Sequence, residues 1–173
     1  VTIVVQTIGA GTERMMALNE GDALEDFVGP LGCPSELCEG ENLEETRKKK
    51  IVFIAGGLGT APVYPQVKWL HEQGVAADVI VGAKTKELLI LEEEMKAVAG
   101  NLYVTTDDGS YGRSGMVTKT IQDLVEQEGK HYDLCVAIGT KIKIYKTQEG
   151  RAYLAAKEKD THHGGCGQCG GEE

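Results

Sequence analysis

A cluster of glycines after a short apolar run is the first group of residues whose spacing could do chemistry. The apolar run 51–55 leads directly into Gly56, Gly57, Gly59, Thr60 and Pro62. In a glycine-rich turn between a strand and a helix, backbone N–H groups can approach a diphosphate closely, with the positive end of the helix dipole behind them. Proline suits the first turn of such a helix, where a missing N–H costs no helical hydrogen bond. The turn therefore predicts a nucleotide-binding site, and a tight turn without a ligand is the alternative.

Two later loops follow apolar runs in the same way and offer side chains for the same ligand. The run 77–81 is followed by Ala83 and Lys84. A cation at the end of the second strand of such a sheet tolerates a 2′-phosphate, so Lys84 favours NADP(H), and an ordinary surface lysine is the alternative. The loop 105–115 contains three glycines and Arg113, which could pair with a phosphate. A plain polar loop is the alternative there, and the candidate binding residues are Asp107, Asp108 and Gly109.

Cysteines and histidines near the end of the chain form a different kind of candidate site. Cys166 and Cys169 are separated by two residues in a glycine-rich stretch, a spacing that lets both thiolates reach one zinc ion or iron–sulfur cluster. Two ligands do not complete such a site, so others would have to come from His162, His163, Cys33 or Cys38. A tail that binds no metal is the alternative. Cys135 lies within an apolar run and is interpreted as a buried, inert thiol.

The elements that must position these residues alternate between strands and helices from residue 51 onward. Helix-spaced apolar residues and turn signals predict helices over 61–73, 86–99 and 115–128. Short apolar runs predict strands over 51–55, 77–81, 101–105 and 132–138. This order predicts an α/β fold, with a parallel-sheet nucleotide-binding domain and helices on both faces. A further helix is expected over 148–159.

The segment before residue 51 has a different pattern. Short β-branched stretches between turn signals predict strands over 1–8, 13–18 and 23–28, as in part of an antiparallel β-barrel. A charged stretch then ends in four consecutive basic residues and is interpreted as a solvated connector. The expected organisation is a partial barrel over 1–37, a linker over 38–50, an NAD(P)-binding α/β domain over 51–160 and a Cys/His/Gly-rich tail over 161–173.

Composition excludes several classes of function. The formal net charge is −9, whereas a nucleic-acid-binding protein needs a basic face. No stretch approaches the roughly 20 apolar residues of a membrane span, so no membrane association is expected. The first residues lack the basic start of a signal peptide, and the five cysteines are an odd number, which argues against a disulfide framework. These features favour a cytoplasmic protein.

Several separated motifs occur in the order found in a known family. They are the stretches 29–32, 55–65, 82–89, 105–112 and 137–139. In these motifs the chain resembles the flavin- and iron–sulfur-containing reductases of the ferredoxin–NADP reductase superfamily. Within that superfamily it resembles the electron-transfer subunits of NADH-dependent ferredoxin–NADP oxidoreductase, sulfide dehydrogenase and dihydroorotate dehydrogenase. The resemblance covers about four fifths of the chain, and motif order makes it more specific than any single glycine turn.

The resemblance implies a function and a set of sites. In such proteins NAD(P)H gives a hydride to FAD, and the flavin passes single electrons to a [2Fe–2S] cluster and on to a ferredoxin-type carrier. By resemblance, Gly11 and Thr12 lie near FAD in a flavin-binding barrel. The nicotinamide nucleotide lies at the turn 56–62 and at Gly139, and the paired cluster cysteines are Cys166 and Cys169. The expected partner is a larger flavoprotein or iron–sulfur subunit.

The chain departs from the family pattern at three places. The arginine-containing flavin motif that normally precedes Val1 is not in this chain, Thr140 stands where the family continues with proline, and the later cluster cysteine is missing. We therefore interpret the chain as a fragment that binds a pyridine nucleotide weakly, carries little FAD and has an incomplete [2Fe–2S] site. The alternatives are a non-catalytic docking or scaffold module that retains the nucleotide-binding fold, and a small metal-binding protein that uses its Cys/His tail.

Overall fold

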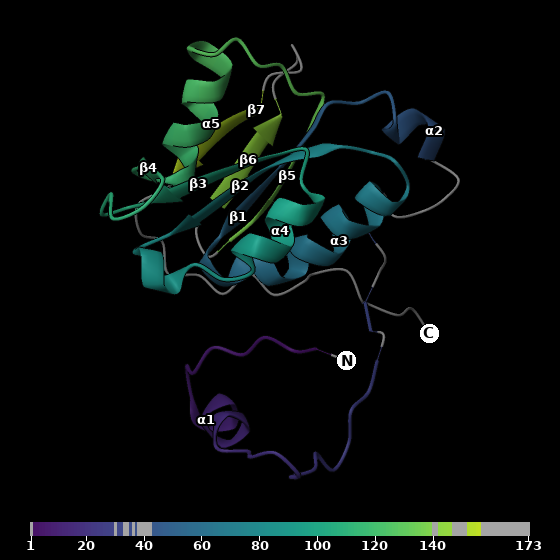
Figure 1. The fold of residues 1–173 in the computed structure, drawn as a ribbon, viewed down its shortest axis with the longest axis vertical. Coiled ribbons are helices and arrows are strands. Elements are labelled where there is room, and N and C mark those ends of the chain that lie inside the picture. The colour runs from purple at the N-terminus through teal and green to yellow at the C-terminus, as the bar shows by residue number, and fades with distance from the viewer. Residues whose placement is uncertain are drawn as a thin grey trace, which may run out of the picture.

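A five-stranded parallel sheet forms the centre of the protein (Figure 1). The computed structural model describes residues 2–29, 31–32, 35, 37 and 43–139, together with the backbone of 142–146 and 152–156. The strand order is β4-β3-β2-β1-β5, and each neighbouring pair is parallel. The strands are β1 (Ile51–Gly56), β2 (Ala77–Ala83), β3 (Asn101–Thr106), β4 (Arg113–Ser114) and β5 (Leu134–Ile138). The predicted α/β fold with a parallel sheet is confirmed.

Helices cover both faces of this sheet, which explains why residues 51–55 of β1 form an unbroken apolar run. On one face, Phe53 of β1 packs with α3 (Thr60–Glu72) and α4 (Glu92–Val98), through Val67 and Met95 among others. On the other face, Ile54 packs with α5 (Val117–Glu126) through Ile121 and Leu124. The side chains from 51 to 55 are all buried. The core of the molecule therefore lies on both sides of β1 and β2.

The helix expected over 86–99 is divided. A short 3-10 helix, η4 (Lys86–Leu88), comes first, and α4 begins only at Glu92. Leu91 between them has φ 56°, a left-handed conformation that a continuous α-helix cannot contain. Three glutamates then occupy the first turn of α4, where the helix dipole favours negative charge. The prediction was right about helical character and wrong about continuity.

The helix expected over 148–159 is wrong. Instead β7 (Ala152–Ala156) pairs antiparallel with β6 (Ile142–Lys146) as a separate two-stranded sheet. A short apolar run carries no periodicity long enough to separate a strand from a helix, so backbone pairing with β6 is decisive.

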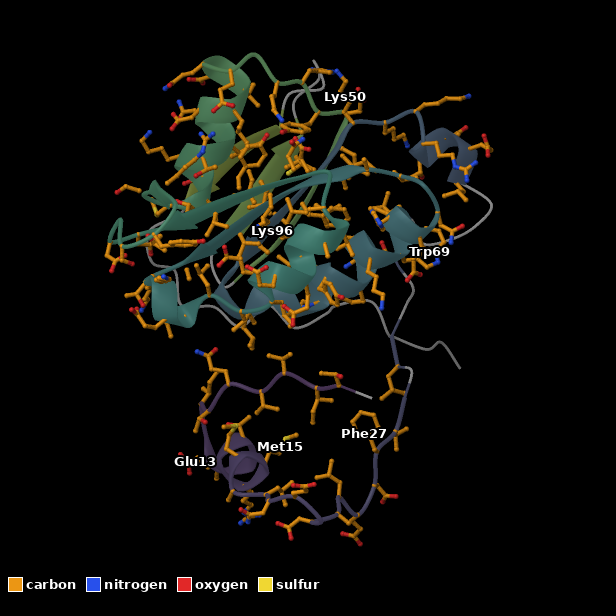
Figure 2. All side chains as sticks on the ribbon, in the orientation of Figure 1. Glu13, Met15, Phe27, Lys50, Trp69 and Lys96 are labelled. Carbon is orange, nitrogen blue, oxygen red and sulfur yellow. The ribbon has the colours of Figure 1, made fainter. Side chains whose placement is uncertain are left out.

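The strands expected before residue 29 are also not formed. Residues 2–29 contain one helix, α1 (Ala10–Met16), and no strand, and Figure 1 shows this segment apart from the sheet. None of its described residues is buried, and most of its apolar side chains, including Phe27 in Figure 2, lie exposed. Lone strands are unstable in water without pairing partners and an apolar face to pack against. The described part of this segment supplies neither, so β-branched composition did not produce strands.

The end of the expected linker belongs to the α/β unit rather than to solvent. Thr46 of the short helix α2 (Leu43–Thr46) is buried, and Leu43 packs against the core. The Arg47 guanidinium donates a hydrogen bond to the carbonyl of Gln73, 3.0 Å away, just after α3. The charged residues of this stretch therefore lie beside two side chains, Leu43 and Thr46, that pack on the α/β unit. No helix in the described part of the chain is long and apolar enough to cross a membrane.

Candidate functional site

The strand order creates one place at the sheet edge where a ligand crevice is expected. From β1 the chain proceeds to β2 and β3 on one side, whereas β5 pairs with β1 on its other side. The loops that follow β1 and β5 therefore diverge at the carboxyl ends of neighbouring strands. Open parallel sheets bind ligands at such a switch point. The candidate residues 56–62 and Gly139 are brought together there.

The turn after β1 presents its backbone at this point. A 3-10 turn, η3 (Gly57–Gly59), runs straight into α3, and its first backbone bond joins the Thr60 N–H to the Gly57 carbonyl. The N–H groups of the preceding residues in the turn have no partner from helical geometry. Gly57 has φ 56°, and a Cβ on it would meet no atom within 4 Å, so the space beside this residue is open. The turn thus offers N–H groups that helical geometry leaves without a partner, and room for a bulky anion.

Gly59 and Thr60 serve the turn in another way. A Cβ on Gly59 would collide with the carbonyl of Ile138 and crowd the N–H of Gly139, so the turn packs backbone to backbone against the end of β5. The side chain of Thr60 is fully buried, and its hydroxyl donates to the Gly57 carbonyl over 2.9 Å. These two residues fix the shape of the crevice. Pro62 lies in the first turn of α3, where no helical hydrogen bond is lost.

The loops after β2 and β3 are joined by backbone hydrogen bonds. The Asp107 N–H donates to the Ala83 carbonyl over 3.0 Å, and the Asp108 N–H donates to the Lys84 carbonyl over 3.2 Å. Ala83 is buried, whereas the other three residues are exposed. Gly109 follows with φ 72°, a left-handed conformation that lets the loop turn back. The second and third groups of candidate residues therefore form one surface at the carboxyl edge.

Ser110, which the sequence analysis did not select, organises this surface. Its N–H donates to the Asp108 carboxylate over 2.9 Å, and its hydroxyl accepts the Lys86 N–H over 3.0 Å. Hydrogen bonds from Ser110 hold the pKa of Asp108 below its ordinary value. The spacing Asp-x-Ser is a recognisable turn signal, in which an aspartate caps the N–H two residues later. The Asp108 carboxylate is therefore ionised and oriented at neutral pH.

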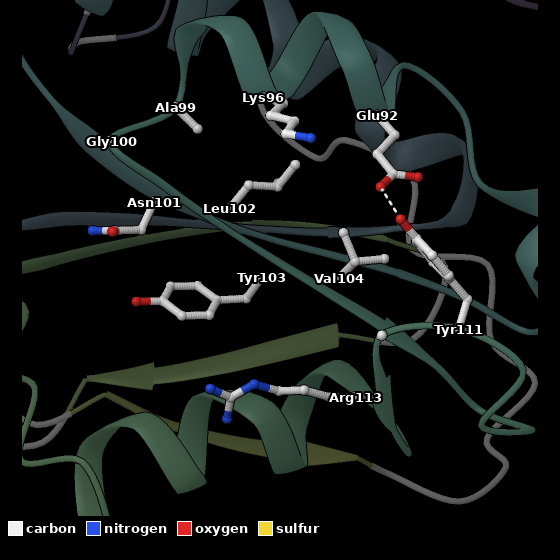
Figure 3. Close-up of a pocket in the computed structure, with 11 residues that line it drawn as sticks. Glu92, Lys96, Ala99, Gly100, Asn101, Leu102, Tyr103, Val104, Tyr111 and Arg113 are labelled. Carbon is white, nitrogen blue, oxygen red and sulfur yellow. Dashed lines mark hydrogen bonds between the residues drawn. The ribbon is translucent and has the colours of Figure 1, made fainter.

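Tyr111 and Glu92 were also missed, because their contact joins a loop to a distant helix. The Tyr111 hydroxyl donates to Glu92 Oε1 over 2.8 Å. Figure 3 shows this hydrogen bond at one end of a cavity of about 560 Å³ along the outer edge of β3, whose walls also include Lys96 and Arg113. The cavity adjoins the candidate surface without containing its residues. Sequence spacing holds no signal for a contact of this kind.

The remaining candidate residues do not join this surface. Gly11 and Thr12 lie in α1, where the Thr12 hydroxyl accepts the N–H groups of Ile8 and Gly9 and donates to the Gly9 carbonyl. With this hydroxyl occupied and no buried side chain among residues 2–29, the described residues do not fit a flavin site. We therefore assign no step to a flavin held by this chain.

Metal-binding residues are not placed. Cys166 and Cys169 fall outside the described residues, as do His162 and His163. Within the described part of the chain, no group of three or more His, Cys, Asp and Glu side chains could hold a metal ion. Cys135 is half-buried in β5, and burial raises the pKa of its thiol to about 11, which agrees with the interpretation of an inert thiol.

Comparison with known proteins gives relatives along the whole chain. An uncharacterized protein encoded in the adh 3′ region of Clostridium beijerinckii is 40% identical over all of this chain and 80% of its own length. The dihydroorotate dehydrogenase B (NAD(+)) electron transfer subunit of Streptococcus pneumoniae is 36% identical over 91% of this chain and 60% of its own length. Its homolog in Thermotoga maritima is 37% identical over 82% of this chain and 46% of its own length. The chain thus spans about half the length of these two electron-transfer relatives.

A solved structure is also similar to this chain in both fold and sequence. It is described as the NADH-dependent reduced ferredoxin-NADP oxidoreductase, studied for flavin-based electron bifurcation. The TM-score is 0.63 with 33% identity, over 78% of this chain and 45% of that chain. No protein-family model matches the chain.

Proposed function

The chain belongs to the ferredoxin–NADP reductase superfamily, and we propose that its α/β domain binds NAD(P)H as the hydride-donor module of an electron-transfer subunit. The observation that carries the proposal is the switch point between β1 and β5. There an open, left-handed Gly57 and the start of α3 face outward beside the tied loops that follow β2 and β3. An oxidoreductase-type protein is consistent with these relatives, and catalysis by this chain alone is not part of the proposal.

Each group of residues has a role in this proposal. The N–H groups at the start of η3 bind the diphosphate, with the dipole of α3 behind them. Gly59 and Thr60 hold the turn in the shape that exposes these groups. The surface formed by Lys84, Asp107 and Asp108 lies at the ends of β2 and β3, one and two strands from β1, where the adenosine ribose is read in such folds.

Bound dihydronicotinamide supplies a hydride, and the protein contributes placement and exclusion of water. The acceptor in this proposal is a flavin held outside the described residues, in a larger flavoprotein or iron–sulfur partner subunit, with a ferredoxin-type carrier downstream. The acidic composition and odd number of cysteines favour a cytoplasmic location for such an assembly.

The charge on the surface formed by Lys84, Asp107 and Asp108 favours NADH over NADPH. Lys84 is one exposed cation there, but the ammonium of Lys86 lies over the Tyr111 ring, 4.9 Å from its centre. Three carboxylates oppose these cations: Asp107, Glu87 and Asp108, which accepts the Ser110 N–H. A hydrogen bond from Thr85 lowers the pKa of Glu87. A 2′-phosphate would meet more negative than positive charge. This proposal reverses the preference expected from Lys84 alone.

Calorimetric titration with NADH and NADPH tests both the binding of a pyridine nucleotide and the preference for NADH. We expect saturable NADH binding, weaker NADPH binding, and a smaller difference between them in Asp108→Asn. Gly57→Ala should weaken binding about tenfold or more, since a methyl group enters the diphosphate space. Gly129→Ala is the matched control, because Gly129 has a similar φ of 66° and open surroundings after α5. Absence of binding at millimolar nucleotide would instead favour the docking or scaffold module.

A further inference from the structure

Tyr111 joins three elements around the loop that follows β3. Its hydroxyl donates to Glu92 Oε1 in the first turn of α4, at one end of the cavity in Figure 3. Its ring lies under the Lys86 ammonium of η4. Its own N–H donates to the buried Thr106 hydroxyl over 3.0 Å, and that hydroxyl donates back to the Tyr111 carbonyl over 2.8 Å. Glu92 raises the pKa of Tyr111, so the phenol is protonated and donates at neutral pH.

The loop that Tyr111 closes is held by hydrogen bonds rather than by buried side chains of its own, and the Ser110 hydroxyl also ties it to the N–H of Lys86. Residues 107–110 are all exposed, and both Gly109 within the loop and Gly112 after it have positive φ. Its outgoing half is tied to the end of β2 through the N–H groups of Asp107 and Asp108. Its returning half is held at Tyr111. A loop with exposed backbone and no buried side chain of its own depends on such end contacts for order.

We propose that Tyr111 is a positioning residue for pyridine-nucleotide binding, which holds the carboxylate-bearing loop 107–110 against the end of β2 through its hydrogen bond to Glu92. This inference rests on the proposed NAD(P)H site and assigns no direct contact between Tyr111 and the nucleotide. Order in the loop before binding reduces the entropy lost on binding, which is how a residue outside the contact surface affects affinity.

Substitutions can separate the role of the Tyr111 hydroxyl from that of its ring. Tyr111→Phe removes the donor to Glu92 and leaves the ring beneath Lys86. Glu92→Gln keeps an acceptor for the hydroxyl, whereas Glu92→Ala removes it. Glu93→Ala is the matched control, because Glu93 is the next glutamate in the same turn of α4 and does not accept the Tyr111 hydroxyl.

The experiment measures NADH affinity by calorimetry and backbone hydrogen exchange of residues 107–110 in all four variants. Tyr111→Phe and Glu92→Ala should each weaken NADH binding about fivefold and accelerate exchange in the loop. Glu92→Gln and Glu93→Ala should stay within about twofold of the parent. Unfolding midpoints should change little, because neither Tyr111 nor Glu92 is buried.

Two outcomes overturn the inference. Parent-like affinity in Tyr111→Phe would show that the hydroxyl has no positioning role. Equal losses in Glu92→Ala and Glu93→Ala would assign the effect to net charge. If the parent protein itself does not bind NADH while Tyr111→Phe still accelerates loop exchange, the proposed function fails and the loop contact stands.

Discussion

Two parts of this chain, residues 2–29 and residues 51–139, have opposite relations to solvent. Residues 51–139 bury two apolar clusters on the two faces of a parallel sheet. Residues 2–29 bury nothing, although they contain comparable apolar side chains. The two phenylalanines of the chain divide between them: Phe53 is 0% exposed and Phe27 is 60% exposed. Apolar composition therefore does not make a core unless paired strands and covering helices close around it.

The contrast also separates two kinds of site residue. Gly57, Lys84 and Asp108 stand on loops that the sheet holds at one edge. Thr12 stands on a single short helix, α1, in which no residue is buried. A binding constellation needs support from rigid elements, so the nucleotide side of the molecule has a framework and the flavin side has none among the described residues.

The largest expected effect comes from the two phenylalanines. Phe53→Ala leaves a cavity between β1 and α3 and should lower the free energy of unfolding by about 4 kcal/mol. Phe27→Ala should change it by less than about 0.5 kcal/mol, since Phe27 is mostly exposed and little packing is lost. Urea denaturation followed by circular dichroism measures both. A comparable loss in Phe27→Ala would show that residues 2–29 pack in solution.

The next effect separates the two glycines of the turn after β1. Gly59→Ala places a methyl group against the Ile138 carbonyl and should cost about 3 kcal/mol of stability. Gly57→Ala only strains a left-handed residue and should cost about 1 kcal/mol. Denaturation midpoints of the two variants give the difference. Equal costs would mean that the turn does not pack against β5.

Asp78 gives a pH-dependent effect. Burial alone would raise its pKa, but hydrogen bonds from Lys130, Asn101 and Tyr132 outweigh burial and lower the pKa below its ordinary value of 3.8. The stabilisation is therefore complete above the unfolded-state pKa and is lost as pH falls through the lower folded-state value. Asp78→Asn should cost about 2 kcal/mol at pH 7 and less at pH values below about 4.

A matched control for Asp78 lies in the exposed segment. The Asp22 carboxylate accepts the N–H of Asn19 over 2.7 Å on the surface, so Asp22→Asn should change stability by less than about 0.5 kcal/mol at any pH. Denaturation at several pH values compares the two variants. A pH-independent loss in Asp78→Asn would contradict the assignment to its carboxylate.

The smallest expected effect concerns two threonine hydroxyls. Thr60→Val removes the buried hydrogen bond to the Gly57 carbonyl and should cost about 1 kcal/mol. Thr12→Val removes the hydrogen bonds at the start of α1 and should leave global unfolding within about 0.3 kcal/mol of the parent, because α1 is not packed on the core. If Thr12→Val lowered the free energy of global unfolding, α1 would belong to the same cooperative unit as the sheet.

Much of the α/β unit could be predicted from its residues. The run 51–55 is apolar at every position because β1 is covered on both faces, and the glycine turn after it needs a left-handed residue at position 57. Helical spacing in α3 places Val63, Val67 and Leu70 on one buried face. These signals are local, so they can be read from the sequence without knowing which segments lie nearby in the fold.

Other features depended on partners far away in the sequence. β-branched residues before 29 formed no strand without pairing partners, and the run at 152–156 became a strand because β6 lies beside it. The roles of Gly59 and Tyr111 come from Ile138 and Glu92, which no spacing rule connects to them. Sequence periodicity thus determined where chain segments are strand or helix in the buried core and which turn can hold a diphosphate. Tertiary contacts determined which strands exist at all and which loops act as one surface, because pairing and packing energies arise only between segments that the fold brings together.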